Sequence, residues 1–329
     1  MNDISVAFTD FWPTFDVKDN FILSALREKF NVTVVDVSEK PDILFYSFFG
    51  TRNLNYPAPV RVYFTGENDV PDFNLCDYAM SFHNIDFGGR HLRLPLYVLY
   101  PEFDALCKGT VVLPDSPYER DFCSMVVSNM KNSDNARRDF FYGLSEYRQV
   151  ASGGRFANNV GGRVADKMAF ISKYRFNIAF ENSSVPGYTT EKIIEAFAAG
   201  SVPLYWGDPL IAKEFNPGAF VNIMDFGSID DAVRYVAELD KDKERYLEFF
   251  DHNPLLNNPY INWKERVAEF LTSIAGSMKR CRVDSGAIGS LFRRRVSREN
   301  TYDIVTMKRP FEKLSGLFKI HSRAGSKKS

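Results

Sequence analysis

The chain has 329 residues, of which 45% are apolar, 25% charged and 15% aromatic. These values are ordinary for a folded globular protein; they exclude collagen-like, disordered and disulfide-scaffold classes, and the length suggests two domains. The formal net charge of −1 is unevenly distributed along the chain. Residues 277–329 contain 14 Lys and Arg and four Asp and Glu, a net charge of +10, whereas residues 1–276, the body of the chain, have a net charge of −11.

The first half of the chain alternates between strand and helix patterns. Short apolar runs predict strands, and a helical spacing of apolar residues at 21–30 predicts a helix between the first two of them. The predicted strands are 4–8, 32–37, 43–49, 60–64 and 78–82. This alternation favours an open, mostly parallel α/β sheet. Four prolines then loosen the pattern over 95–118, where we place a domain boundary.

A second alternation follows the boundary. The predicted strands are 122–128, 150–151, 176–181 and 202–205, and the predicted helices are 135–147, 167–174, 191–199, 229–239, 242–252 and 263–275. We therefore predict two Rossmann-like domains, residues 1–118 and 119–276, and a basic amphipathic tail at 277–329. Ligands of such sheets bind beyond the carboxyl ends of the strands, so the strand-to-helix loops are where functional residues are expected.

One such loop stands out in the second domain. The apolar strand at 177–180 delivers Glu181 and Asn182 to its carboxyl end, and Thr189 or Thr190 is placed to cap the helix that follows. A helix N-terminus offers free N–H groups and the positive end of a dipole, which together favour a phosphate group.

Lys192 lies in the first turn of that helix, although cations are favoured at helix C-termini. A basic residue placed against this preference indicates an anionic ligand. The alternative interpretation is a solvated lysine on an amphipathic helix.

The segment FNIAFENSSVPGYTTEKIIEAFAAGSVPLYWG (176–207) closely resembles the signature of the α-1,3-fucosyltransferase family. VYFTGEN (62–68), VVSN (126–129), ARRDFFY (136–142), SGGRFANNVG (152–161) and FNPGAFVNIMD (215–225) resemble further segments of that family, in the same order. The resemblance implies a GT-B enzyme, with two Rossmann-like domains facing across a cleft. Such an enzyme transfers L-fucose from GDP-β-L-fucose, with inversion, to O3 or O4 of GlcNAc in a Gal–GlcNAc-type glycan. GDP-fucose is then the donor substrate, and no cofactor is required.

The resemblance also implies roles for individual residues. Inverting transfer needs a general base for the acceptor hydroxyl and positive charge for the departing diphosphate. Glu67 matches the family's base. Arg137 matches the arginine that contacts the diphosphate, with Arg138 as a neighbouring alternative, since a guanidinium donates two parallel bonds to phosphate.

Other matches complete the expected donor site. Lys192 would be the second phosphate cation, and Glu191 would accept hydrogen bonds from ribose or sugar hydroxyls. The remaining donor-binding candidates are Ser128, Asn129, Asn182 and Tyr188.

We expect no essential metal, because His, Cys and carboxylate residues show no metal-ligand spacing. Asp240-Lys241-Asp242 has the Asp-x-Asp form that some glycosyltransferases use for a divalent metal. It lies in a run of charges, LDKDKER, and we expect a solvated face there.

Two alternatives stay open at this stage: a GT-B transferase that uses another nucleotide sugar, and a non-catalytic protein that binds anionic surfaces through the tail. The acidic body argues against a nucleic-acid partner. Within the tail, 291–298 and 311–320 combine basic and bulky apolar residues, typical of a helix at an anionic membrane surface. The other interpretation is a helix that packs on the body.

We also expect a cytoplasmic location, because the four cysteines are widely spaced and neither a signal peptide nor a transmembrane segment is apparent. If the basic tail binds an anionic membrane, we expect the protein to be attached peripherally to the inner face of the plasma membrane.

Overall fold

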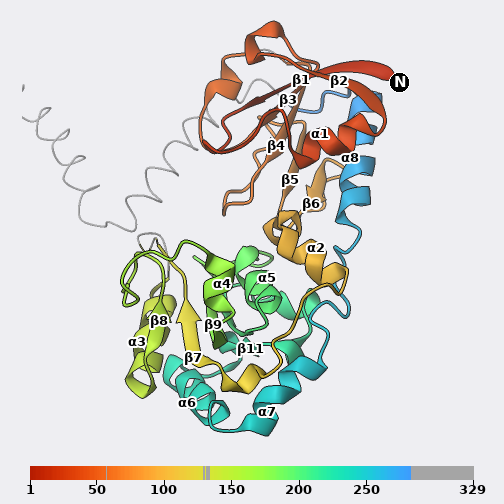
Figure 1. Ribbon diagram of the computed structural model, residues 1–329. Coiled ribbons are helices and arrows are strands. Elements are labelled where there is room, and N and C mark those ends of the chain that lie inside the picture. The colour runs from red at the N-terminus through yellow and green to blue at the C-terminus, as the bar shows by residue number, and fades with distance from the viewer. Residues whose placement is uncertain (57, 129, 131–133, 283–329) are drawn as a thin grey trace, which may run out of the picture. The chain divides into compact units, whose positions relative to one another are not determined.

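Two parallel β-sheets, one of six strands and one of five, organise the part of the chain that the structure describes (Figure 1). The structure is a computed structural model, and it describes residues 1–56, 58–128, 130 and 134–282. Both sheets belong to one unit, Met1–Arg282. The predicted α/β class with two parallel sheets is confirmed.

The first sheet has the strand order β2-β1-β3-β4-β5-β6, and all neighbouring pairs are parallel. Helices α1 (Phe21–Arg27) and α2 (Pro101–Cys107) belong to the same half of the chain. The three-residue strand β6 and helix α2 fall in or beside the segment where the sequence pattern loosens, and neither was predicted. The strands are β1 (Asn2–Thr9), β2 (Phe30–Val34), β3 (Ile43–Tyr46), β4 (Val60–Phe64), β5 (Tyr78–Ser81) and β6 (His91–Arg93).

The second sheet has the order β11-β10-β9-β7-β8, again with parallel pairs throughout. Its strands are β7 (Asp121–Met125), β8 (Val150–Ser152), β9 (Tyr174–Phe180), β10 (Val202–Trp206) and β11 (Val221–Asn222). Its helices are α3 (Asn135–Tyr147), α4 (Lys167–Ile171), α5 (Glu191–Ala198), α6 (Ile229–Leu239) and α7 (Lys243–Glu248). Strand β9 begins at Tyr174, so the predicted helix at 167–174 ends earlier than expected.

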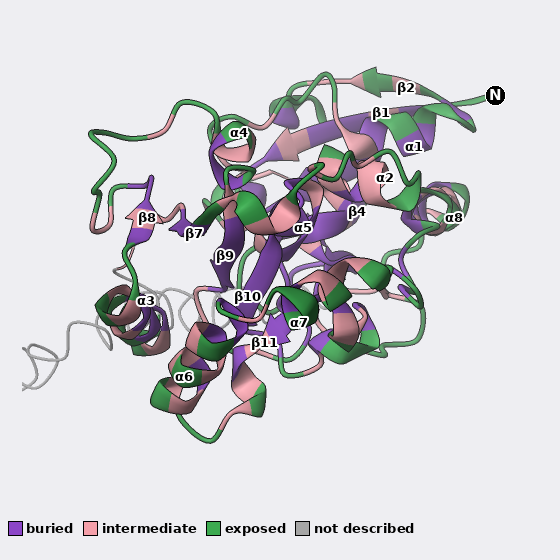
Figure 2. Ribbon diagram, turned by 60° about the horizontal axis from the view of Figure 1, so that its bottom comes forward, coloured by how far each residue is buried: buried purple, intermediate pink, exposed green. Residues whose placement is uncertain are grey.

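The central strands are buried on both faces, which explains why they appear in the sequence as continuous apolar runs. All four residues of β3 are buried, as are six of the seven in β9. Figure 2 shows this pattern as buried strands beneath helices whose outer faces are exposed. Burial of apolar side chains from both sheets therefore supplies most of the stabilisation of the fold.

The last described helix, α8 (Trp263–Ser277), packs against α1 of the first half. The Trp263 and Phe21 rings lie 6.3 Å apart, and Val267 and Leu271 share the hydrophobic core of the first sheet. The sequence pattern placed this helix in the second domain, because its partner face is decided by contacts far away in sequence. The domain boundary at residue 118 itself stays a prediction.

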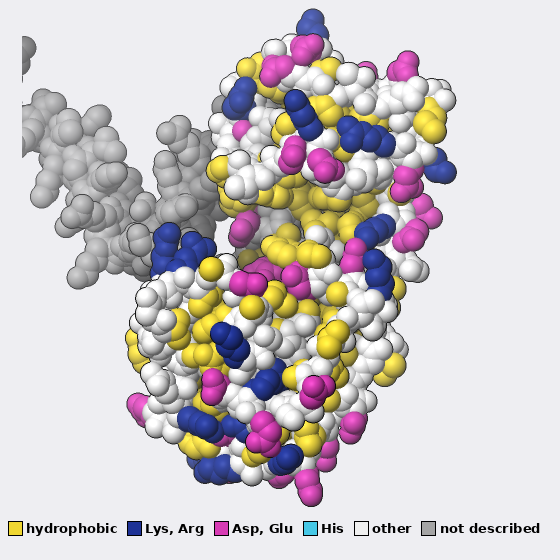
Figure 3. Space-filling view, viewed as in Figure 1, with side chains coloured by type: hydrophobic (Ala, Val, Ile, Leu, Met, Phe, Trp, Pro, Cys, Tyr) yellow, Lys and Arg dark blue, Asp and Glu magenta, His cyan; other side chains and the backbone are white. Residues whose placement is uncertain are grey.

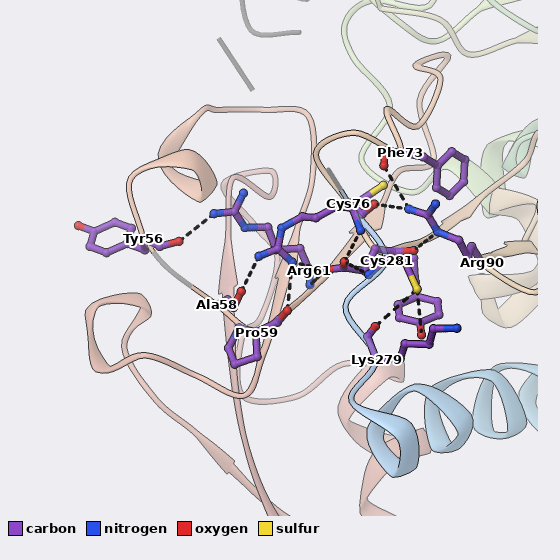
Figure 4. A network of polar contacts seen from close by, with 12 residues as sticks. Tyr56, Ala58, Pro59, Arg61, Phe73, Cys76, Arg90, Lys279 and Cys281 are labelled. Atoms are coloured by element: carbon purple, nitrogen blue, oxygen red, sulfur yellow. Dashed lines mark hydrogen bonds and ion pairs between the residues drawn. The ribbon is translucent and has the colours of Figure 1, made fainter. Parts of the chain in front are cut away.

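The chain after α8 is tied to the first sheet by a network of polar contacts around the buried Asp77, and Figure 4 shows Cys281 and Lys279 of this segment in that network. Asp77, which precedes β5, accepts hydrogen bonds from the backbone N–H groups of Cys281 (2.6 Å) and Arg282 (2.8 Å). The Arg282 guanidinium forms an ion pair with Asp77 and donates to the carbonyl of Ala58 at 2.7 Å. The tail segments 291–298 and 311–320 lie outside the described residues. No helix among those described has the length and hydropathy needed to cross a bilayer.

Candidate active site

The functional residues predicted from sequence lie at or beyond the carboxyl ends of strands. Because every sheet pairing is parallel, these ends meet at one edge of each sheet. Glu67 follows β4 in the first sheet, and Asn182 follows β9 in the second. The side chain of Asn68 donates to the Ser183 hydroxyl at 3.2 Å, so the two loops touch. Figure 3 shows a hollow in the face of the molecule lined by hydrophobic and acidic side chains.

Glu67 has a carboxylate without a hydrogen-bond or ion-pair partner among the described residues, and its side chain is open to solvent. Surrounding protein nevertheless partly desolvates it, and this raises the pKa of Glu67. Lys192 opposes the rise, whereas Glu191 and Glu181 add to it, so all three lie within electrostatic reach. A carboxylate that is unpaired and has a raised pKa is suited to accept a proton.

Lys192 is surrounded by oxygen atoms at the start of α5. Its ammonium lies 2.7 Å from Thr190 Oγ1, 3.1 Å from Glu181 Oε2 and 3.3 Å from Glu191 Oε1. Desolvation disfavours the charged form, but attraction to Glu181 and Glu191 outweighs it and raises the pKa of Lys192. The lysine therefore stays charged at any physiological pH.

This geometry corrects two sequence expectations. Thr190 is the N-cap residue of α5, but its hydroxyl donates to Glu181 at 2.7 Å and makes no cap hydrogen bond. Lys192 is placed against the helix dipole because a fully buried carboxylate, Glu181, lies within ion-pair distance. The dipole argument for an anionic ligand is therefore not needed to explain the lysine.

Glu181 is a residue of this site for which the sequence predicts no role. It accepts the Thr190 backbone N–H at 2.7 Å as well as the hydroxyl and the lysine, and it is fully buried. The available signal was a carboxylate placed directly at the end of an apolar strand. Its partners lie nine and eleven residues away across a loop, a separation that local patterns do not resolve.

Arg137, on α3, is buried with 1% of its surface exposed. One Nη donates to the Phe180 carbonyl (2.5 Å) and to Asn182 Oδ1 (2.9 Å), so two predicted donor residues meet. Its Nε finds no hydrogen-bond partner in the described part of the chain, and no carboxylate there forms an ion pair with it. Desolvation lowers the pKa of Arg137, partly offset by Glu181. A buried cation without a counter-ion is costly unless an anionic ligand joins it.

Tyr188 is 3% exposed, and its ring packs 4.9 Å from that of Phe82 in the loop after β5. The preceding Gly187 has φ +86°, and a Cβ there would lie 2.8 Å from the Phe82 carbonyl. The close approach of the two loops therefore requires glycine at this position.

The loop that carries Tyr188 is held from both halves of the chain. Asp208 accepts the Gly187 N–H at 2.7 Å and the Thr189 hydroxyl at 3.2 Å. Arg93, the last residue of β6, donates to the Gly187 carbonyl at 3.3 Å and to Glu214 at 2.5 Å. The loop before α5 is thereby attached to the first sheet.

Of the two remaining donor candidates, Ser128 and Asn129, only Ser128 lies among the described residues. Ser128 is exposed three residues beyond β7, and the structure shows no contact between it and Arg137 or Lys192. Asn129 lies outside the described residues.

The charged run around Asp240 is solvated as expected at Lys241 and at residues 243–245, but Asp240 itself is an exception. Asp240 is 4% exposed, forms an ion pair with Arg175 and accepts from Arg148 at 3.1 Å and Tyr147 at 3.0 Å. Its charge is therefore used inside the fold. Within the described ranges, no group of three or more His, Cys, Asp or Glu side chains could hold a metal ion.

Comparison with known proteins identifies the family. Residues 6–100 match the Alpha-(1,3)-fucosyltransferase FucT N-terminal domain, and residues 118–283 match Glycosyltransferase family 10 (fucosyltransferase) C-term. The chain belongs to glycosyltransferase family 10.

Individual members of family 10 agree with this assignment. The chain is 34% identical over 292 residues to the Alpha-(1,3)-fucosyltransferase FucT of Helicobacter pylori, covering 77% of this chain and 60% of that protein. It is 35% identical over 146 residues to a human 4-galactosyl-N-acetylglucosaminide 3-alpha-L-fucosyltransferase, covering 44% and 38%. The chain thus spans less than two thirds of the length of these relatives.

A crystal structure of an alpha1,3-fucosyltransferase with GDP-fucose superposes with a TM-score of 0.73 at 30% identity, covering 86% of this chain and 93% of that one. The GT-B architecture implied by the resemblance is thereby confirmed for this family 10 chain.

Proposed function

We propose that this chain transfers L-fucose from GDP-β-L-fucose, with inversion, to O3 or O4 of GlcNAc in a Gal–GlcNAc-type acceptor. The observation that carries the proposal is the carboxylate of Glu67, which has no partner among the described residues and lies within electrostatic reach of Lys192, a predicted donor-binding cation. Family 10 membership and the GDP-fucose bound by a 30% identical enzyme support the choice of donor.

The donor diphosphate would lie against Arg137 and Lys192. Arg137 has a buried Nε that lacks a partner in the described residues, and a phosphate oxygen would supply one. Attraction to Lys192 and Lys167 lowers the pKa of Glu191 to about 2 in spite of desolvation. Glu191 therefore stays ionised and can accept hydrogen bonds from sugar hydroxyls.

Transfer then needs one proton movement. Glu67 takes the proton from the acceptor hydroxyl while the acceptor oxygen attacks C1 of fucose. The bond between C1 and the β-phosphate oxygen breaks, and GDP leaves with the electron pair. Attack opposite the leaving group converts the β-linked donor into an α-linked product. Lys192 and Arg137 stabilise the charge that develops on the diphosphate.

Incubation of the protein with GDP-fucose, GDP-mannose or UDP-N-acetylglucosamine and a panel of lactose, N-acetyllactosamine and type 1 acceptors tests this proposal. We expect transfer from GDP-fucose alone, and linkage analysis of the product identifies O3 or O4. Free GDP should raise thermal stability, by about 2.7 kcal/mol at 100 times its Kd. Transfer from another sugar nucleotide, or no stabilisation by GDP, would overturn the donor assignment.

A further inference from the structure

Aromatic rings gather at the carboxyl-end edge of the first sheet. The Phe11 and Phe15 rings stack 4.0 Å apart, and the Trp12 ring lies 6.2 Å from Phe49 and 6.4 Å from Phe64. These residues come from three separate strand ends: those of β1, β3 and β4.

The two loops that carry Trp12 and Phe49 are held together by Asp10. Its carboxylate accepts the N–H groups of Arg52 (3.0 Å) and Asn53 (2.8 Å), and its carbonyl accepts the N–H of Phe49 at 3.0 Å. Asp10 has φ +61°, in the left-handed region that non-glycine residues rarely occupy. Such strained residues gather at functional sites, where the surrounding structure compensates for them.

The aromatic group is not closed off as core. Phe49 keeps 45% of its surface exposed, and Trp12 is half-buried. Phe64, whose ring lies 6.4 Å from that of Trp12, is followed three residues later by Glu67, so the rings and the proposed base belong to the carboxyl-end edge of the same sheet. Ligand sites combine apolar and aromatic walls with a few polar groups in this way.

We propose that Trp12 and Phe49 form an aromatic wall that binds the apolar C–H face of a pyranose ring of the acceptor. The inference rests on the proposed function, which supplies a β-galactoside acceptor at the Glu67 edge. An aromatic ring offers a flat apolar face with little conformational entropy to lose, which suits the C–H face of a sugar. Phe11, Phe15 and Phe64 pack against Trp12, and Asp10 holds the two loops of the wall together.

Phe49→Ala and Trp12→Leu test the wall, with Phe49→Tyr as the conservative variant. For N-acetyllactosamine we expect KM to rise at least tenfold in the first two, with kcat within threefold and the KM for GDP-fucose unchanged. Phe49→Tyr should restore the acceptor KM to within about twofold of the parent. Thermal melting of each variant, with and without GDP, shows whether the fold and the donor site are intact.

Calorimetric titration of N-acetyllactosamine into GDP-saturated protein measures acceptor binding without turnover. Leu256→Ala, which truncates a side chain that is 63% exposed elsewhere, is the matched control and should leave all values unchanged. Acceptor KM and affinity within twofold of the parent in both Phe49→Ala and Trp12→Leu would overturn the wall. Absence of fucose transfer by the parent protein, in contrast, would overturn the proposed function.

Discussion

Three carboxylates at the site, Glu67, Glu181 and Glu191, lie within reach of one lysine, Lys192. Glu181 and Glu191 form ion pairs with it, whereas Glu67 makes no such contact within the described residues. The environment separates the pKa values of Glu191 and Glu67: that of Glu191 falls to about 2, and desolvation raises that of Glu67. Residues of one type acquire different tasks in this way, and the unpaired group is the one able to take up a proton.

The acidic limb of the pH–rate profile should belong to Glu67. Because its pKa is raised above 4.5 and the base must be deprotonated, kcat/KM should fall as the pH drops through that raised value. Glu67→Gln should lower turnover by about 10²–10⁴-fold and leave GDP affinity unchanged. Since Glu191 raises the pKa of Glu67, Glu191→Gln should move the limb to lower pH. An unchanged acidic limb in the residual activity of Glu67→Gln would exclude the assignment.

Neighbouring arginines offer a second test at the residue scale. Arg137→Ala should weaken GDP binding by about 10- to 100-fold, because charge-assisted hydrogen bonds contribute roughly 1.5–3 kcal/mol. Arg138→Ala is the matched control, since Arg138 is exposed and pairs with Asp139 at 3.0 Å. Calorimetry with GDP measures both. Equal affinities for the two variants would remove Arg137 from the donor site.

At the scale of elements, the loop between β9 and α5 is held by residues that its own sequence does not contain. Asp208 follows β10 and Arg93 ends β6, so both sheets contribute to its position. Arg93 also donates to the Phe82 carbonyl at 2.8 Å, and the Tyr97 hydroxyl donates to Glu214 at 2.9 Å. The ion pair of Arg93 with Glu214 is therefore part of a buried network across the chain.

Arg93→Ala should destabilise the protein by about 3–5 kcal/mol, because it leaves Glu214 buried without a cation. Desolvation raises the pKa of Glu214 although Arg93 lowers it, so its ionised form is already disfavoured in the folded state. Loss of Arg93 raises that pKa further. The deficit should consequently shrink as the pH falls and Glu214 becomes protonated.

Urea unfolding at pH 5 and pH 8 measures this deficit. Lys264→Ala, which breaks the exposed 2.7 Å pair with Asp104, is the matched control and should cost under about 1 kcal/mol at both pH values. If Arg93→Ala also lowered the free energy of unfolding by less than about 1 kcal/mol, the buried pair would not support the fold.

At the scale of the whole molecule, the last described segments of the chain pack against its N-terminal half. Helix α8 packs on α1, and Asp77 holds residues 281–282 beside β5. The charge of the chain changes sign at the end of α8: the segment 277–329, with a net charge of +10, begins at the last residue of that helix. We propose that this segment attaches the protein to an anionic membrane surface, supported by its basic and apolar composition.

Co-sedimentation with anionic vesicles tests this proposal by comparison of the full chain with one that ends at Gly289. Each Lys or Arg near such a surface contributes about 1 kcal/mol, so the full chain should bind at low salt and dissociate as salt screens the charges. The shortened chain should not bind. Negligible binding of both at low salt would contradict the proposal.

Local patterns in the sequence were enough to predict the two parallel sheets and the positions of most strands. Glu67 and Arg137 were named as site residues through the family resemblance, Lys192 also through its place in the first turn of a helix, and all three stay predictions. Strands buried on both faces are continuous apolar runs, and a motif made of a few neighbouring residues can be read directly from the sequence. The roles of these residues in transfer still depend on the proposed function.

Only the tertiary structure decided which distant groups share an environment. Glu181 takes the Thr190 hydroxyl away from the expected helix cap, Asp240 is buried between two arginines, and α8 packs on the first sheet. Trp12 and Phe49 meet because parallel strands bring their carboxyl ends to one edge. Each of these outcomes depends on how deeply a residue is buried and on which residues far away along the chain contact it. A local sequence pattern encodes neither the burial nor the distant contacts.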